Sequence, residues 1–230
     1  MSLNAKFDED PEGYEAIRQC WLNSRRTMFI KDWLRSLALP PGARVLEIGS
    51  GTGLLLRNLG GQFPAFDFTG LEPIAAYVDF ASARRGPPNV RFVPGTAETA
   101  GKSVSGPFHA ILSNDVLHHV ESVGETVSNA AAISARGCRW LAIEPNPANP
   151  YVFCSQSLRT GEKNFRPAEF LGICGGNGWR LTRRGYIFAI PPFVKEAPDW
   201  MTSLERRIEG FALIAGGIRL DLEFPRPSRR

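Results

Sequence analysis

Apolar and polar residues alternate in blocks through the first two thirds of the chain. Five short blocks rich in valine, isoleucine, leucine and phenylalanine have the composition of buried strands, and they cover residues 44–48, 67–71, 90–94, 108–113 and 139–143. Blocks with helical spacing or many alanines separate them, at 54–59, 73–83 and 124–135. This alternation predicts an α/β fold with a parallel sheet and right-handed crossovers, whose ligands gather at the carboxyl ends of the strands.

The two ends of the chain follow a different pattern. Residues 11–39 have apolar side chains at helical spacing and predict one helix or two, which Pro40-Pro41-Gly42 ends. After Glu144 we expect a helix, a strand, an amphipathic helix and a last strand at 167–174, 179–189, 199–215 and 218–224. We therefore expect a single domain over residues 1–230, made of a helical segment (1–41), a ligand-binding core (42–145), a later part (146–224) and a flexible basic tail (225–230).

The most specific motif begins in the first strand. Val45-Leu46-Glu47-Ile48 runs through one acid directly into Gly49-Ser50-Gly51-Thr52-Gly53, three glycines spaced two residues apart. Glycines let the chain turn sharply and let a ligand touch the backbone without interference from a Cβ atom. The dinucleotide spacing Gly-x-Gly-x-x-Gly needs its third glycine at position 54, which is Leu54, so the motif fits NAD poorly.

This string resembles motif I of the class I S-adenosylmethionine (SAM) dependent methyltransferases, in which an acid precedes the same three glycines. Gly70-Leu71-Glu72-Pro73 ends the second strand with an acid that can accept hydrogen bonds from both ribose hydroxyls of an adenosine. Gly95-Thr96-Ala97-Glu98 follows the third strand and resembles the stretch that holds adenine in this superfamily. Residues 113–120, Ser-Asn-Asp-Val-Leu-His-His-Val, resemble the segment after strand 4 that holds the methionine end of SAM.

The resemblance implies a Rossmann-like, doubly wound and mostly parallel seven-stranded sheet in the order 3-2-1-4-5-7-6, with an antiparallel seventh strand beside the fifth. It implies SAM as the cofactor and S-adenosylhomocysteine as the product. The cofactor-binding residues that it implies are Glu47, Gly49, Ser50, Gly51, Gly53, Glu72, Pro73, Thr96, Ala97, Glu98, Ser113 and Asn114.

Two of these residues have a second interpretation. Thr96 stands where the superfamily usually has an acid, and its hydroxyl is a weaker acceptor for the adenine amine, so the Ala97 backbone and Glu98 are better candidates. Thr96 would alternatively cap a short helix. Glu72 would alternatively be an acid stabilised by the positive end of a helix dipole.

The candidate catalytic residues are His118, His119 and Glu144. Either histidine could accept a proton from a substrate hydroxyl, since an imidazole titrates near neutrality, or could serve only in packing or in positioning SAM. Glu144 ends the fifth strand and could be a base, a substrate ligand or an acid that anchors the following loop. Tyr14 and Trp21 could form a lid over SAM, and the stretch 153–170 could cover the acceptor.

A metal site is a weaker interpretation of the same segment. Asp115, His118 and His119 are spaced i, i+3 and i+4, so on a helical turn they could converge on one point. Some hydroxyl methyltransferases hold a divalent cation here, but His118 stands where those enzymes have a glutamate and no fourth ligand is evident. We expect no metal. His109, at the opposite end of the fourth strand, is expected to be structural.

Composition adds bounds on location and partners. The net charge is +4, but several of the basic residues lie in the last few residues and in short pairs, without the basic and aromatic stripe of a nucleic-acid surface. Four scattered cysteines and the absence of a long apolar run indicate a cytoplasmic protein with reduced thiols and no membrane span. Monomer and homodimer both remain open.

The resemblance therefore implies an enzyme that transfers a methyl group from SAM, by in-line displacement, to a hydroxyl group of a small molecule, sugar or lipid intermediate, and less readily to an amine. Three alternatives remain: a metal-assisted RNA 2′-hydroxyl methyltransferase, an NAD(P) oxidoreductase, and an inactive SAM-binding subunit. The Asn-Pro-Pro-Tyr motif of DNA base methylation does not follow the fourth strand.

Overall fold

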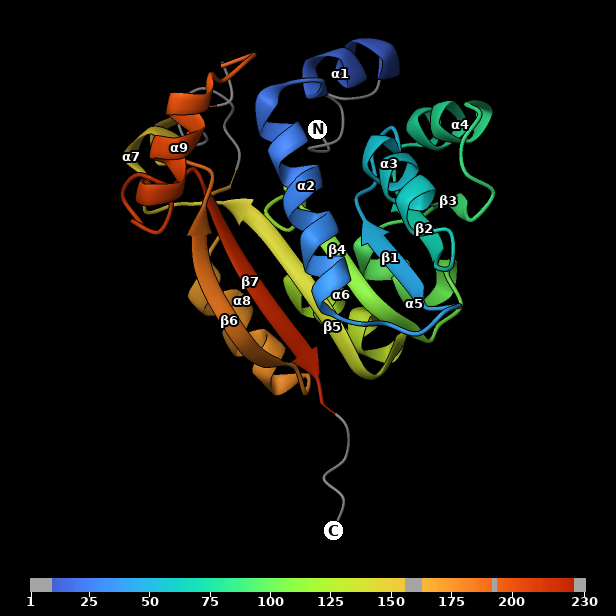
Figure 1. The fold of residues 1–230 in the computed structure, drawn as a ribbon. Helices are drawn as coiled ribbons and strands as arrows, with labels where there is room; N and C mark the ends of the chain where they lie inside the picture. Colours follow the sequence, from blue (N-terminus) through green and yellow to red (C-terminus); the bar gives the residue numbers. More distant parts are fainter. Residues whose placement is uncertain (1–9, 156–162, 192–193, 226–230) are drawn as a thin grey trace.

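A seven-stranded sheet with helices on both faces organises the computed structural model, which describes residues 10–155, 163–191 and 194–225 (Figure 1). The strand order is β3-β2-β1-β4-β5-β7-β6, as predicted. The strands are β1 (Arg44–Ile48), β2 (Asp67–Glu72), β3 (Val90–Pro94), β4 (Phe108–Asn114), β5 (Ser134–Pro145), β6 (Arg180–Ile187) and β7 (Gly217–Phe224). Most of the expected basic tail, 226–230, lies outside the described residues.

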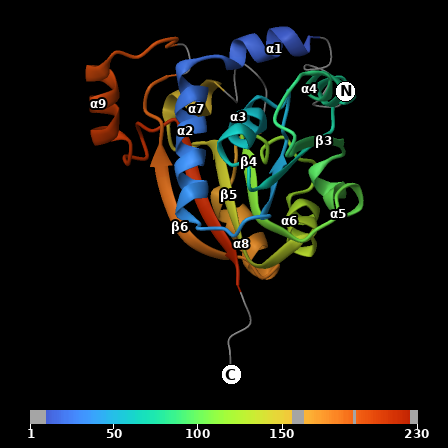
Figure 2. The same ribbon diagram turned by 45° about the vertical axis from the view of Figure 1, so that its right-hand side comes forward.

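Ten helical elements surround the sheet in the described residues. They are α1 (Pro11–Arg18), α2 (Trp21–Ser36), α3 (Leu54–Gln62), α4 (Ala75–Ala83), the 3₁₀ turn η2 (Ala97–Thr99), α5 (Ala100–Ser103), α6 (Val123–Ala132), α7 (Pro150–Cys154), α8 (Pro167–Gly176) and α9 (Asp199–Ile208). The two views in Figures 1 and 2 place α2 and α3 on one face and α6 and α8 on the other. None of these helices is both long and apolar enough to cross a bilayer.

The register of the parallel strands builds the site. Strands β1 to β5 run parallel, and Ile48 pairs with Leu71 of β2 and Ser113 of β4. The next residues along each strand, Gly49, Glu72 and Asn114, therefore meet at one edge of the sheet. Motifs that are far apart in the sequence come together because each directly follows a strand.

Two apolar cores lie on the two faces of the sheet. On one face, Ile30 and Leu34 of α2 pack with Leu56 of α3 against Val45 and Phe68 of the strands. On the other face, side chains of α6 and α8 pack against Ile111, Trp140 and Leu220. Successive strand residues serve opposite faces, which is why the strands are apolar along their whole length.

The later part of the chain differs from the predictions in detail. As expected, β7 is antiparallel and lies between β5 and β6. The helix predicted over 199–215 ends at Ile208, before Gly210, and is followed by turns. The short helix α7 was not predicted; it forms because Pro150 is at its first position and the Asn149 side chain accepts hydrogen bonds from the N–H groups of Tyr151 and Val152.

Candidate active site

The glycine loop after β1 needs its glycines for two reasons. Gly49, Gly51 and Gly53 all have positive φ angles, of 72°, 52° and 76°. A Cβ atom at Gly49 would also clash with Val116, and one at Gly53 would clash with Phe92. Gly53 thus serves the start of α3, whereas Gly49 and Gly51 line the pocket that the loop borders.

This pocket has a volume of about 600 Å³ and lies across the carboxyl ends of β1 to β4. A smaller pocket of about 80 Å³ also borders Gly49, Gly51 and Asn114. Ten of the twelve predicted cofactor residues line one or both, namely Glu47, Gly49, Ser50, Gly51, Glu72, Pro73, Thr96, Ala97, Glu98 and Asn114. Gly53 and Ser113 line neither; the Ser113 hydroxyl accepts a hydrogen bond of 3.0 Å from the Trp140 indole.

Glu72 is held rigidly at the end of β2. Its carboxylate accepts hydrogen bonds from the N–H groups of Gly51 at 2.8 Å and Ile74 at 3.1 Å. Burial raises the pKa of Glu72, and these two hydrogen bonds oppose that rise. Each oxygen keeps a second lone pair, so the carboxylate can accept further hydrogen bonds from a ligand in the larger pocket.

The smaller pocket contains polar atoms without partners. Glu47 Oε2, Ser50 Oγ and Asn114 Oδ1 are buried and have no hydrogen-bond partner among the described residues. Burial raises the pKa of Glu47 well above its ordinary value, and the nearby Glu72 raises it further, while Arg18 lowers it. Buried polar atoms are rarely left unsatisfied, so a ligand with a hydrogen-bond-donating cation, such as the ammonium group of SAM, fits this pocket.

The turn after β3 gives Thr96 and Glu98 structural contacts. Thr99 Oγ1 accepts a hydrogen bond from the Thr96 N–H at 3.1 Å, within a capping box at the start of η2. Glu98 Oε1 accepts hydrogen bonds from the N–H groups of Glu121 at 2.8 Å and Ser122 at 3.3 Å. Thr96 therefore has the capping role considered from the sequence, and both residues still border the larger pocket.

The N-terminal helices supply two arginines that the sequence analysis missed, Arg18 and Arg26, beside the expected Tyr14. Tyr14 and Arg18 of α1 line both pockets, and Arg26 of α2 lines the smaller one. Asp115, with a φ of 55°, forms ion pairs with Arg26 at 2.5 Å and Arg18 at 3.5 Å. Arginines are frequent in this chain, so only their position in the helices before motif I could have signalled a role.

The charges around Asp115 fix its ionisation. Burial alone would raise the pKa of this carboxyl, but Arg26 and Arg18 lower it, and the net pKa is below the ordinary value. Helix α1 is also attached through buried Glu15, which forms ion pairs of 2.7 Å with Arg57 and Arg84. Of the two residues considered as a lid, Tyr14 of α1 lines both pockets, whereas Trp21 lines neither.

Glu144 connects the end of β5 to the segment after β4. One carboxylate oxygen accepts hydrogen bonds from the N–H groups of Val116 at 3.1 Å and Leu117 at 2.9 Å. The other lies 2.7 Å from His118 Nδ1. Because an ionised carboxylate only accepts, His118 Nδ1 carries a proton, and in the neutral form of the ring Nε2 then has the basic lone pair. Glu144 itself is fully buried, as an anchoring and orienting acid would be.

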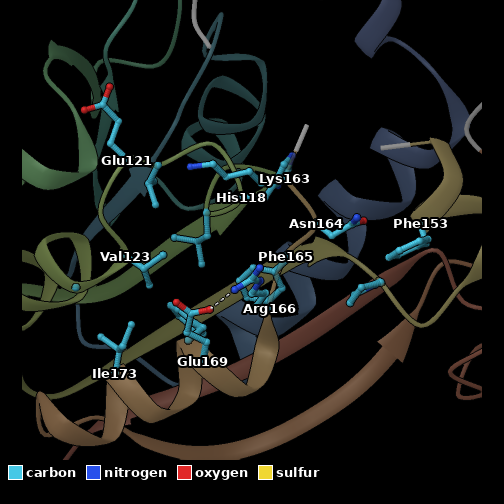
Figure 3. A pocket seen from close by; sticks show the side chains of 15 residues that line it. His118, Glu121, Val123, Phe153, Lys163, Asn164, Phe165, Arg166, Glu169 and Ile173 are labelled. Atoms are coloured by element: carbon cyan, nitrogen blue, oxygen red, sulfur yellow. Dashed lines mark hydrogen bonds and ion pairs between the residues drawn. The ribbon is translucent and has the colours of Figure 1, made fainter. Parts of the chain in front are cut away.

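His118 lines a third cavity, of about 910 Å³, on the side of α6 and α8 (Figure 3). Its buried surface is apolar and includes Leu117, Phe165 and Phe170, while Lys163 and Arg166 are exposed. Figure 3 shows His118 and Lys163 on one side of the cavity and Ile173 on the opposite side. Residues 156–162, part of the stretch expected to cover an acceptor, lie outside the described residues.

The two histidines lie side by side where this cavity meets the predicted cofactor pocket, and Val120 and Glu121 border both. His119 lines the larger pocket, His118 lines the third cavity, and their ring centroids are 3.9 Å apart. They do not converge with Asp115, whose carboxylate faces Arg18 and Arg26. No group of three or more histidine, cysteine or acidic side chains within the described ranges could hold a metal ion. His109 has a structural contact, since its Nδ1 accepts a hydrogen bond from the Arg44 N–H.

Solved structures that are similar to this chain include methyltransferases. The methyltransferase of Haloferax volcanii in complex with the Trm112 methyltransferase activator has a TM-score of 0.66 and 15% identity, over 96% of this chain and 95% of the other. A geranyl diphosphate methyltransferase with sinefungin has a TM-score of 0.65 and 14% identity, over 88% and 79%. A SAM-dependent methyltransferase of Archaeoglobus fulgidus has a TM-score of 0.62 and 15% identity, over 86% and 94%. These likenesses confirm the predicted fold.

Sequence comparison assigns the family. No curated protein matches the chain. The family described as methyltransferase domain matches residues 22–148, which is more than half of the chain and includes every predicted cofactor residue. The chain therefore belongs to the methyltransferase domain family and is a class I SAM-dependent methyltransferase, not an NAD(P) oxidoreductase.

Proposed function

We propose that this methyltransferase methylates a hydroxyl group of a small molecule, sugar or lipid intermediate that binds in the cavity beside His118. His118 acts as the general base, and Glu144 orients it. The observation that carries the proposal is the contact of 2.7 Å between His118 Nδ1 and buried Glu144, in the wall of a cavity of about 910 Å³.

This contact favours a hydroxyl acceptor over an amine. A neutral amine attacks with its own lone pair, whereas a hydroxyl becomes a strong nucleophile only as it loses its proton. Nε2 of His118 is the atom that would accept this proton. The carboxylate of Glu144 stabilises the imidazolium that forms, because it lies against the opposite ring nitrogen.

The two smaller pockets are proposed to hold SAM, which supplies a methyl group already activated on a sulfonium. Glu72 would accept hydrogen bonds from the ribose, and Glu47 and Asn114 would accept them from the ammonium group. Arg18 and Arg26 would bind the carboxylate of the methionine end, in competition with Asp115. Such an arrangement mainly aligns the reactants and excludes water, which is what an in-line methyl transfer requires.

The cavity walls suit an acceptor with an apolar part. Its buried lining is mostly aliphatic and aromatic, while the charged Lys163, Arg166 and Glu169 are exposed. A geranyl diphosphate methyltransferase with the same fold acts on an acceptor of comparable character. No observation favours RNA, because the Asp115, His118 and His119 cluster that would assist it is not formed.

The test combines a binding and a turnover measurement. Calorimetry with SAM should detect binding by the wild type and by His118→Ala, and incubation of a cell extract with methyl-labelled SAM should transfer label with the wild type but not with His118→Ala. His109→Ala is the matched control, since it removes a histidine outside the site and should transfer label normally.

Three outcomes would contradict the proposal. Failure of the wild type to bind SAM at millimolar concentration would remove the cofactor assignment. Undiminished transfer by His118→Ala would show that His118 is not the general base. SAM binding without transfer to any component of the extract would favour the alternative of an inactive SAM-binding subunit.

A further inference from the structure

Residues 199–215 expose five of their seven large apolar side chains, while Met201 and Ile208 are half-buried. The ten large apolar side chains that are exposed among the described residues include Trp200, Leu204, Phe211, Leu213 and Ile214 of this one segment. Trp200 is 65% exposed and Leu213 is 71% exposed. Apolar surface of this density in a short stretch marks a binding surface rather than ordinary scatter.

The inward side of α9 carries a buried acid. Glu205 of α9 is only 2% exposed, and its carboxylate accepts hydrogen bonds from the N–H groups of Ala189 and Ile190. It also forms an ion pair of 3.2 Å with Arg25 of α2, and Arg25 reaches Glu209 at 3.3 Å. Helix α9 is therefore fixed to the domain by a buried acid, with Trp200 and Leu204 directed outward.

The turn after α9 is held in the same way. The Asn146 amide donates hydrogen bonds to the carbonyl oxygens of Ala212 at 2.6 Å and Ala215 at 2.7 Å. The Asn149 amide donates one of 2.7 Å to the carbonyl of Ile214. These contacts fix the backbone of the turn while its apolar side chains remain in solvent.

This surface continues onto α7, which begins directly after Asn149. Tyr151 and Phe153 of α7 are exposed, and Phe153 also lines the cavity beside His118. Both views of the fold place α7 and α9 beyond the end of β5 (Figures 1 and 2). We call the seven apolar residues of α7, α9 and the turn the outer apolar surface. It adjoins the proposed acceptor cavity.

The exposed charges at the C-terminal end of α9, beside this surface, are positive. Arg206 and Arg207 are exposed, whereas Glu205 and Glu209 are directed to Arg25. Asp199 lies at the other end of the helix, where the helix dipole favours an acid. Exposed tryptophan and leucine next to arginine is the composition of helices that lie in the interface of an anionic bilayer.

We infer that the outer apolar surface binds the headgroup region of anionic membranes and gives the cavity access to an amphipathic acceptor held there. The inference rests on the proposed function, since it specifies the acceptor of the same cavity. A bilayer fits better than a second copy of the chain, because a copy seated on Phe153 would cover the edge of the cavity that the acceptor must use.

The binding test uses the full-length protein without SAM. It is sedimented with vesicles of phosphatidylcholine, with or without about one third of phosphatidylglycerol. We expect binding to the anionic vesicles, weakened at about 0.5 M NaCl, where the charges are screened. Trp200 is the most exposed of the five tryptophans, so its emission should shift to shorter wavelength when the anionic vesicles are added.

Variants assign the binding to this surface. The double substitution Trp200→Ser and Phe211→Ser should weaken vesicle binding about tenfold or more, because both side chains leave the interface. Arg206→Glu with Arg207→Glu should remove the preference for anionic vesicles. Leu181→Ser is the matched control, since Leu181 is an exposed apolar residue on β6, outside the surface, and should bind as the wild type does.

Absence of wild-type binding to anionic vesicles overturns the inference, as does equal binding by the double variant. A wild-type dimer that becomes a monomer on the Trp200 and Phe211 substitutions would instead assign the surface to a second copy. Because vesicle binding needs neither SAM nor an acceptor, its failure leaves the His118 experiment unaffected. Conversely, vesicle binding can succeed even if His118→Ala retains full transfer.

Discussion

The cofactor side and the acceptor side of this protein recognise ligands in different ways. On the cofactor side, the candidate contacts come from glycine backbone and from acids in the last two residues of a strand, at Glu47, Gly49 and Glu72. On the acceptor side, apolar side chains from α6, α7, α8 and residues 163–166 line the cavity. Recognition by backbone requires particular residues at particular spacings, whereas an apolar wall can be built from many residues in many orders.

Glu144 is the point where the two sides meet, and its removal should have the largest effect. Glu144→Ala leaves the N–H groups of Val116 and Leu117 and the ring of His118 without their acceptor inside the protein. We expect a loss of about 3 kcal/mol in the free energy of unfolding, measured by urea denaturation. Glu144→Gln keeps one acceptor oxygen and should lose less stability.

If the two sides were independent, Glu144→Ala would affect acceptor turnover alone. We expect weaker SAM binding as well, because Val116, whose N–H group Glu144 holds, borders the cofactor pocket. Unchanged SAM affinity in a folded Glu144→Ala protein would contradict the joint role and separate the two sides.

The next largest effect is expected on the cofactor side alone. Glu72→Ala should weaken SAM binding by about 2 kcal/mol, because a charged acceptor of the ribose is lost. Calorimetry gives the value. Glu125→Ala is the control, since Glu125 is an acid in the first turn of α6 that borders the same pocket, and it should alter the affinity by less than about 0.5 kcal/mol. Equal losses in the two variants would mean that any acid near the pocket suffices.

A smaller effect of opposite sign is expected at Glu47. The pKa of its carboxyl is raised in the folded protein, by burial first and by Glu72 second, so the ionised form is disfavoured. Stability from this group is present at low pH and is lost as the pH rises through the folded pKa. Glu47→Gln should therefore stabilise the SAM-free protein at neutral pH, by about 1 kcal/mol or 2–4 °C in melting temperature.

The same substitution should reduce the increase in melting temperature that SAM produces, because the ligand ammonium loses an ionised partner. Thermal unfolding with and without SAM at pH 7 measures both effects. A Glu47→Gln protein that is less stable without SAM would show that the wild-type carboxylate has a partner inside the protein.

The sequence predicted the cofactor side closely. The predicted bounds of β1 and β3 agree to the residue, and the strand order is correct, because apolar strands closed by glycine or proline leave a strong local pattern. The same reasoning could not foresee α7 or the end of α9, where one capping side chain or one glycine decides the structure.

Tertiary contacts explain what the sequence left open at the site. From the sequence, Glu144 could be a base, a substrate ligand or an acid that anchors a loop, and its contact with His118 became evident only when β4 and β5 lay side by side. Arg18 and Arg26 were missed because their ion pairs with Asp115 join residues about ninety positions apart. Such pairs leave no periodic or spaced pattern in a single chain.

The contact of Glu144 with His118 has a consequence for substrate change. Both residues belong to the core strands and their connections, and neither lies on α6 or α8, which supply five of the fifteen residues that line the cavity. Substitutions on α6 or α8 would therefore change which acceptor binds, while His118, the proposed proton acceptor, keeps its position. Redesign of this enzyme toward a new acceptor can therefore begin on two helix faces, with the reacting groups left untouched.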